Sequence, residues 1–292
     1  MVSPMVPLPP IHTVIGVDFS GAAKSGKTAW IAEMAVQGDS NRMELTVLKS
    51  LGSLAGCDDR AAVCVSLADR ILACAGSLVG MDFPFGLPIE LGLGAWPDQL
   101  RHVQQFDGDA KDYGRSLVAR AQQLGDTMHI RRKTDRETKT PFDCYHYRII
   151  YQTFHGMRDV LALICDDPAT SVLPFQYPKL RECKRIVVEA CPSSTLKRLS
   201  LPHQKYKQSG GKPPDDNHKT VRRSILKGVN ATGKNANVLI SPHHRRIIMQ
   251  DSGGDALDAV LSAIGSWQAF RSADHVNIAN HQRYPAEGRV YA

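Results

Sequence analysis

The sequence has 292 residues, of which 42% are hydrophobic and 22% are charged. These values are near the averages of globular proteins and exclude a disordered or fibrous chain. No apolar run approaches the ~20 residues that a membrane-spanning helix needs, so we expect no membrane protein. The formal net charge is +7, which favours anionic partners such as nucleic acid.

The N-terminus and the cysteines add two expectations. Residues 1–12 are rich in proline and lack the basic start and sustained apolar core of a secretion signal, so we predict a flexible N-terminal arm. The seven cysteines are odd in number and none are spaced Cys-x-x-Cys, which argues against a disulfide framework or a zinc site. We therefore expect reduced thiols and a cytoplasmic protein.

Three segments that follow the arm predict a meander of strands. Residues 13–19 form an apolar run with many β-branched side chains, and residues 43–49 alternate apolar and polar side chains. Residues 28–37 between them are ambiguous between strand and helix. An antiparallel arrangement of three strands is the simplest account of this region.

A helix and two further strands follow. Residues 58–75 carry apolar side chains at helical spacing, and residues 77–83 form a buried strand that requires a parallel crossover. Residues 185–190 predict another strand, and residues 253–270 predict a helix with a face of small side chains. This order predicts an α/β fold with a mixed sheet.

We expect one domain over residues 13–275. It contains a long insertion at about 90–180, with helical periodicity at 113–124 and 144–165, and a basic loop at about 200–220. Residues 276–292 show little pattern and are predicted to be a tail.

Acidic side chains stand where predicted elements end. Asp18 closes the first strand, Asp82 closes the strand after the helix, and Glu189 closes the next strand. Asp255 and Asp258 lie three residues apart in the first turn of the last helix, and therefore on one face. Taken singly, such residues suit turns or a helix N-terminus. Together they predict a site for Mg²⁺ or Mn²⁺, because clustered carboxylates repel each other without a cation.

Four motifs carry these acids, in the order GVDFSGA (16–22), GMDFPFGLP (80–88), VVEACPSST (187–195) and GGDALDAVLSA (253–263). This order resembles the predicted RNase H-like nuclease family (domain of unknown function 429). The segments RRKTD at 131–135 and QTFHGMRDVL at 152–161 are also similar to members of that family. The resemblance spans about residues 13–270.

The resemblance implies an RNase H-like fold, with a mixed five-stranded sheet flanked by helices and a long helical insertion before the fifth strand. It also implies that Asp18, Asp82 and either Asp255 or Asp258 hold metal ions. Glu189 is expected near them, where it orients water or binds a second ion. The expected activity is that of a metal-dependent nuclease or other phosphodiester hydrolase, in which a divalent metal activates water.

A competing motif follows the first strand. Gly21 to Thr28 match the Walker A pattern G-x-x-x-x-G-K-[ST]. That loop needs a helix beginning near its lysine, whereas the residues that follow suit a strand. An ATP-binding phosphotransferase or ATPase is the alternative function. Under either function, the candidates to bind phosphate are Ser20, Gly21, Lys24 and Lys27.

Basic residues are concentrated in two parts of the chain. Between Arg181 and Arg246 they far outnumber the acids, which favours sequence-independent contacts to a nucleic-acid backbone. In the insertion, four side chains are predicted to form a basic wall that grips phosphate near the acids: Arg131, Arg132, Arg148 and Arg158. The expected partner is therefore nucleic acid or a nucleotide. A third interpretation is a nucleic-acid-binding module without turnover, in which the acids are structural.

Overall fold

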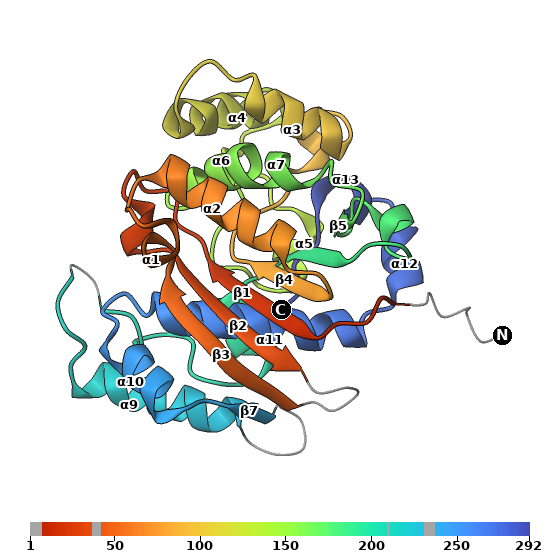
Figure 1. Ribbon diagram of the computed structural model, residues 1–292. Helices are drawn as coiled ribbons and strands as arrows, with labels where there is room; N and C mark the ends of the chain where they lie inside the picture. Colours follow the sequence, from red (N-terminus) through yellow and green to blue (C-terminus); the bar gives the residue numbers. More distant parts are fainter. Residues whose placement is uncertain (1–7, 37–41, 209–210, 231–236) are drawn as a thin grey trace.

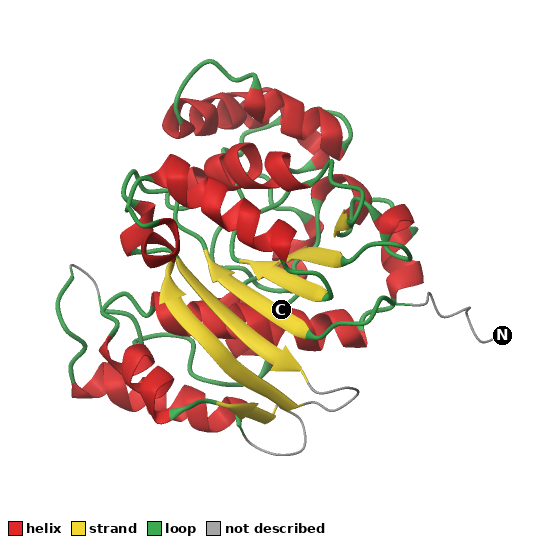
Figure 2. Cartoon of the chain, viewed as in Figure 1, coloured by secondary structure: helices red, strands yellow, loops and turns green. Residues whose placement is uncertain are grey.

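The computed structural model describes residues 8–36, 42–208, 211–230 and 237–292. Within these ranges, seven strands form one mixed sheet in the order β5-β6-β4-β1-β2-β3-β7, and helices cover both of its faces (Figures 1 and 2). The strands are β1 (Thr13–Asp18), β2 (Trp30–Val36), β3 (Arg42–Ser50), β4 (Ser77–Met81), β5 (Thr170–Val172), β6 (Arg185–Glu189) and β7 (Asn237–Leu239).

The helices of the described chain fall before, within and after the long insertion. The α-helices are α1 (Leu51–Ala55), α2 (Arg60–Ala73), α3 (Trp96–Gln104), α4 (Ala110–Leu124), α5 (Lys133–Glu137), α6 (Ile150–Gly156), α7 (Ala162–Ile164), α8 (Pro192–Arg198), α9 (Asp216–Val229), α10 (Pro242–Gln250), α11 (Asp255–Ser272), α12 (His275–Ala279) and α13 (Tyr284–Glu287). A π-helical turn, η3 (Met157–Leu161), joins α6 to α7, and single 3₁₀ turns are η1 (Ser25–Lys27), η2 (Ile89–Leu91) and η4 (Tyr177–Lys179). Within the described ranges, none of these helices has the length and apolar character needed to span a bilayer.

The α/β class is confirmed. Strands β1, β2 and β3 form the expected antiparallel meander, which makes the ambiguous segment 28–37 a strand, and β4 and β6 continue the sheet in parallel. The expected number of five strands is wrong, because β5 and β7 pair onto the two edges of the described sheet. Each has only three residues, too few for side-chain alternation to predict a strand.

Three segments expected to be irregular contain helices. The polar stretch after residue 128 holds α5, and the basic loop ends where α9 begins at Asp216. The predicted tail forms α12 and α13, and its last residues pack against β6: Val290 forms a bridge to Glu189, and Tyr291 is buried. The boundary expected at residue 275 is therefore not a boundary of the packed structure.

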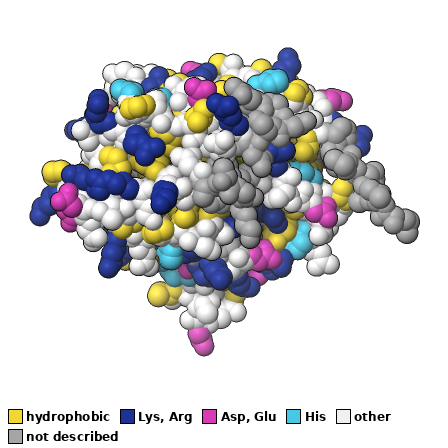
Figure 3. All heavy atoms as spheres, turned by 90° about the horizontal axis from the view of Figure 1, so that it is seen from below, with side chains coloured by type: hydrophobic (Ala, Val, Ile, Leu, Met, Phe, Trp, Pro, Cys, Tyr) yellow, Lys and Arg dark blue, Asp and Glu magenta, His cyan; other side chains and the backbone are white. Residues whose placement is uncertain are grey.

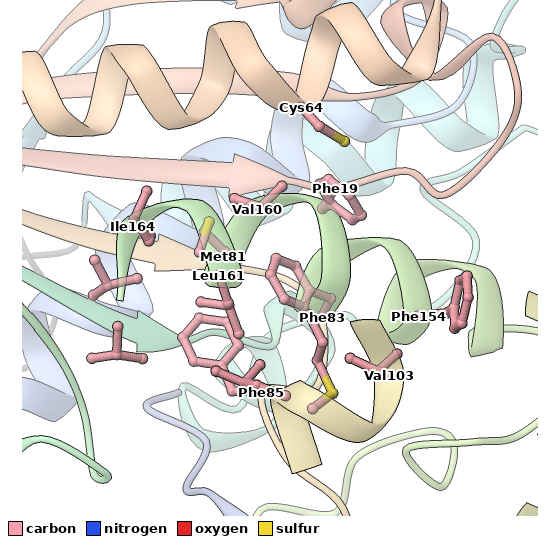
Figure 4. Packing of buried hydrophobic residues seen from close by; sticks show 14 of the residues in the cluster. Phe19, Cys64, Met81, Phe83, Phe85, Val103, Phe154, Val160, Leu161 and Ile164 are labelled. Carbon is pink, nitrogen blue, oxygen red and sulfur yellow. The ribbon is translucent and has the colours of Figure 1, made fainter. Parts of the chain in front are cut away.

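Side chains of β1 alternate between two apolar cores. Ile15 and Val17 face the core beneath α2 and the insertion helices, part of which Figure 4 shows, whereas Val14 faces the core beneath α11. Alternation along the parallel strands β4 and β6 likewise assigns each side chain to one of the two cores. This alternation therefore determines which residues at the strand ends face α11.

Two glycines allow α11 to lie directly on the sheet. Gly16 and Gly80 are partners in the register of β1 and β4. A Cβ on Gly16 would lie 2.0 Å from the carbonyl oxygen of Ala259, and one on Gly80 would lie 2.0 Å from Oγ of Ser266. The close approach places the first turn of α11 beside the C-terminal ends of β1 and β4.

Candidate active site

Carboxylates from three separate elements meet at the C-terminal ends of β1 and β4. Asp18 ends β1, Asp82 follows β4, and Asp258 lies in the first turn of α11; all three line one pocket of about 300 Å³. Asp18 continues the alternation of Gly16, and Asp82 that of Gly80, so both side chains lie on the α11 side of the sheet. The predicted convergence of these three acids is thus present in the structure.

A buried phenylalanine follows each strand-end acid. Phe19 and Phe83 pack in the core on the opposite face of the sheet, with ring centroids 4.9 Å apart (Figure 4). The backbone is further fixed because the amide of Asp82 donates to the carbonyl of Val17 at 2.9 Å, and Gln152 Nε2 donates to the carbonyl of Phe19 at 2.6 Å. At each strand end, the buried phenylalanine that follows the aspartate therefore fixes the backbone that carries the carboxylate.

The acids in the pocket perturb one another. Burial raises the pKa of Asp18 well above its usual value, with the nearby acids adding to the shift and Lys207 opposing it. Burial and the charge of Asp258 raise the pKa of Asp82 to about 8, and burial raises that of Asp255 to about 6. Such shifts indicate like charges gathered away from water.

Lys207 provides positive charge within this cluster. Its Nζ forms an ion pair with Oδ2 of Asp258 and lies 3.7 Å from Oδ1 of Asp255, and the hydroxyl of Tyr206 donates to Oδ1 of Asp258 at 2.8 Å. Of the two acids on α11, Asp258 lines the pocket beside Asp18, while Asp255 meets Lys207 without lining the pocket. The sequence singled out neither Tyr206 nor Lys207, because a Tyr-Lys pair in a basic loop has no distinguishing pattern.

The donor set suits a hard divalent ion, because all the converging groups are carboxylates. Among the residues that the structure describes, however, no three His, Cys, Asp or Glu side chains are grouped closely enough to hold a metal ion together. The ammonium of Lys207 lies among the carboxylates instead. The acids fit the predicted ion by their chemistry, and a bound ion would meet the ammonium of Lys207 at these carboxylates.

Glu189 lies in the same pocket wall, but its charge is already paired. Oε1 accepts from Arg132 Nη2 at 2.5 Å, and Oε2 accepts from Arg132 Nη1 at 2.8 Å and from the amide of Phe85 at 2.9 Å. Asp135 also binds Arg132, and all three charged side chains are buried. Glu189 is in register with Met81, whose side chain faces the core opposite α11. The predicted role of Glu189 in orienting water or binding an ion is therefore not supported by its contacts, because it holds Arg132 instead.

The Walker-like loop lacks the context of a nucleotide site. Strand β2 follows it after the single turn η1, where a Walker loop requires a helix. Its glycines serve packing: a Cβ on Gly21 would lie 2.2 Å from the backbone of Tyr151, and one on Gly26 would lie 2.7 Å from Asp58. The structure thus contradicts a Walker A loop at this position.

The polar side chains of this loop are partly engaged in it. The Ser20 hydroxyl accepts hydrogen bonds from the Thr28 hydroxyl at 2.8 Å and from the amide of Ala22, and Lys27 forms an exposed ion pair with Asp58 at 3.8 Å. Lys24 is exposed. None of these side chains lines the acidic pocket, so the phosphate-binding prediction for Ser20, Gly21, Lys24 and Lys27 has no geometric support there.

The predicted basic wall does not form around the acids. Of its four arginines, only Arg132 lines the acidic pocket, and its charge is paired as described. Arg131 binds Asp143 at 2.7 Å, and Arg158 binds Asp159 at 2.7 Å beside a different pocket. Arg148 is exposed and lies over the rings of Phe142 and Tyr147.

The basic segment from 181 to 246 is only partly a surface. Arg222 on α9 is buried and donates to the backbone carbonyls of Tyr206, Ile248, Asp251 and Ser252, so it holds the segment that carries Lys207. On the face that Figure 3 shows, Lys and Arg side chains are spread out and do not gather in one patch. Charge alone therefore does not mark a binding face in this region.

Cys191 lies in the wall of the acidic pocket. Burial raises the pKa of its thiol to about 12, and the Ser194 hydroxyl donates to its sulfur at 3.2 Å. The thiol therefore stays protonated, as expected of a structural cysteine.

No family model, curated protein or solved structure matches this chain. Membership of a known family is therefore not shown.

Proposed function

We propose that the chain is a metal-dependent phosphodiester hydrolase with an RNase H-like core, acting on nucleic acid. The observation that carries this proposal is the convergence of Asp18, Asp82 and Asp258 in one pocket, although more than 170 positions separate the last two in the sequence. The antiparallel strands β1, β2 and β3, with β4 and β6 added in parallel beside β1, give a mixed sheet that supports this proposed core.

The three pocket acids, with Asp255 adjacent to them, are the residues that would hold Mg²⁺ or Mn²⁺, and their side chains would have to draw closer together to do so. When bound, the ion supplies charge stabilisation for a phosphodiester group and activates water. A bound ion would compete with the ammonium of Lys207, because that ammonium pairs with Asp258. Lys207, once displaced, would be available to neutralise a phosphate oxygen at the pocket.

The surrounding residues keep the acids in position. Tyr206 holds one oxygen of Asp258 by hydrogen bonding, and Phe19 and Phe83 fix the backbone behind Asp18 and Asp82. On the opposite wall of the pocket, Arg132 and Glu189 form a buried ion pair, so neither side chain presents an unpaired charge. The chain thus supplies an acidic pocket with one displaceable positive charge.

The test compares cleavage of supercoiled DNA, single-stranded DNA, RNA and a four-way junction in Mn²⁺, in Mg²⁺ and in chelator. We expect cleavage only with a divalent ion, and loss of cleavage and of calorimetric Mn²⁺ binding in Asp18→Asn and Asp258→Asn. Asp69→Asn, an exposed acid on α2, is the matched control and should behave as the wild type. Cleavage that persists in chelator or in Asp18→Asn, or absence of Mn²⁺ binding, would refute the proposal.

A further inference from the structure

Two tyrosines in the insertion are exposed beside a second pocket. The side chain of Tyr147 is 70% exposed and that of Tyr151 is 40% exposed. Both line a groove of about 470 Å³ between α4 and the start of α6, together with Val118, Tyr145 and Ile150. We call this groove, lined mainly by aromatic and aliphatic side chains, the aromatic groove. Large exposed rings at a mostly apolar groove indicate a surface that binds a partner.

A series of ring contacts links the aromatic groove to the acidic pocket. Tyr145 stacks on His129 with centroids 5.2 Å apart, His129 lies 5.5 Å from His146, and His146 stacks on Phe142 at 4.9 Å. Tyr147 also lies 4.4 Å from His146. Phe142 lines the acidic pocket, so the series of rings runs from one site to the other.

The backbone also brings the two sites together. Gly21, three residues beyond Asp18, lies against the backbone of Tyr151, where even a Cβ would not fit. The next residue, Gln152, lines the acidic pocket. The aromatic groove and the acidic pocket are therefore lined by neighbouring residues of one segment.

The rim of the aromatic groove carries unpaired positive charge. The guanidinium of Arg148 lies 5.8 Å from the ring centroid of Tyr147, and its Nε donates to the Tyr147 hydroxyl at 3.3 Å. Arg148 and Lys111 form no ion pair within the described part of the chain, whereas the nearby acids Asp112 and Asp143 are paired with Arg115 and Arg131. The free charge at the groove is thus positive and complements a phosphate backbone.

We propose that the aromatic groove binds the unpaired bases of single-stranded nucleic acid and guides the strand into the acidic pocket; this second step rests on the function proposed above. Each base has a flat face that stacks on Tyr147 or Tyr151, and Arg148 and Lys111 neutralise the adjoining phosphates. Bases of a duplex are already stacked within the helix, so the groove selects single strands and unpaired ends.

The experiment measures binding in chelator, so that no turnover is needed. Fluorescence anisotropy with labelled oligothymidylate, oligouridylate and a DNA duplex of equal length gives the affinities of the full chain and its variants. Tyr147→Ala and Tyr151→Ala should each weaken single-strand binding about tenfold, and Tyr147→Phe should retain it. Leu163→Ala, an exposed side chain on α7 outside the groove, is the control. The two single-stranded probes distinguish DNA from RNA as the source of the strand.

Salt and metal titrations complete the design. Arg148→Gln should lower the salt dependence of single-strand binding by about one unit of logarithmic slope, because one phosphate contact is lost. Wild-type affinity in both tyrosine-to-alanine variants, or an equal loss of duplex binding, would overturn the inference. Calorimetric Mn²⁺ binding should be unchanged in these variants. A chain that binds no metal and cleaves nothing, but loses single-strand binding in them, would refute the proposed function and support the groove as a binding site.

Discussion

Replacement of Lys207 by methionine tests whether its ammonium occupies the place of a divalent cation. Two unit charges about 4 Å apart interact by about 1 kcal/mol in water and about 4 kcal/mol at an effective dielectric constant near 20. The side chain of Lys207 is 46% exposed, so screening reduces its effect below that of a buried pair. We therefore expect Lys207→Met to lower the free energy of unfolding in chelator by about 1–3 kcal/mol.

The same variant should bind Mn²⁺ more tightly, because the ion no longer competes with an ammonium. A relief of about 1–3 kcal/mol corresponds to roughly a five- to hundredfold lower dissociation constant by isothermal titration calorimetry. Lys212→Met, which removes an exposed charge from the same segment, is the control. An unchanged or higher dissociation constant in Lys207→Met would show that the lysine and the ion do not share a position.

Two further predictions concern the stability of the metal-free protein. Because the pKa of Asp82 is about 8 in the folded protein, against a usual value of 3.8, the folded protein binds a proton that the unfolded chain does not bind at pH values between these two pKa values. Stability in chelator should therefore rise as the pH falls through that window, by up to about 1.4 kcal/mol per pH unit. Urea unfolding should show this slope in the wild type and a smaller slope in Asp82→Asn, where Asp18 and Asp255 still contribute; an equal slope in both would exclude Asp82 as a source. Gly16→Ala should lower the free energy of unfolding by about 1–3 kcal/mol, because its Cβ would meet the backbone of α11. Gly125→Ala, with open space around its Cβ, should not, and equal urea midpoints would contradict the close-packing argument.

Much of the framework could be predicted from periodicity, because the strands β1, β3, β4 and β6 and the helices α2 and α11 have long, clear patterns. The edge strands β5 and β7 could not, since three residues give no period. The C-terminal segment was misinterpreted for a related reason: α12 and α13 are short, and their burial against β6 arises from tertiary contacts.

The acidic side chains of the site could be predicted where their position follows from the end of a strand. Asp18, Asp82 and the pair Asp255 and Asp258 could be grouped from the order of elements, but the choice of Asp258 over Asp255 could not. Glu189 could not be separated from them, because the face it occupies depends on its register with Met81, which the sequence does not reveal. Lys207 was missed because its role depends on how one loop returns to the sheet, and local sequence carries no signal for that.

The paired phenylalanines have a wider consequence for this protein. Repulsion among the gathered carboxylates acts to push the ends of β1 and β4 away from α11, and rings such as Phe19 and Phe83, packed in the core on the far side of the sheet, oppose that movement. Charge repulsion on one face of the sheet is thus balanced by the hydrophobic packing of the phenylalanine rings on the other face. Replacing either ring with a smaller side chain would therefore loosen the spacing of the negative charges on the other face of the sheet.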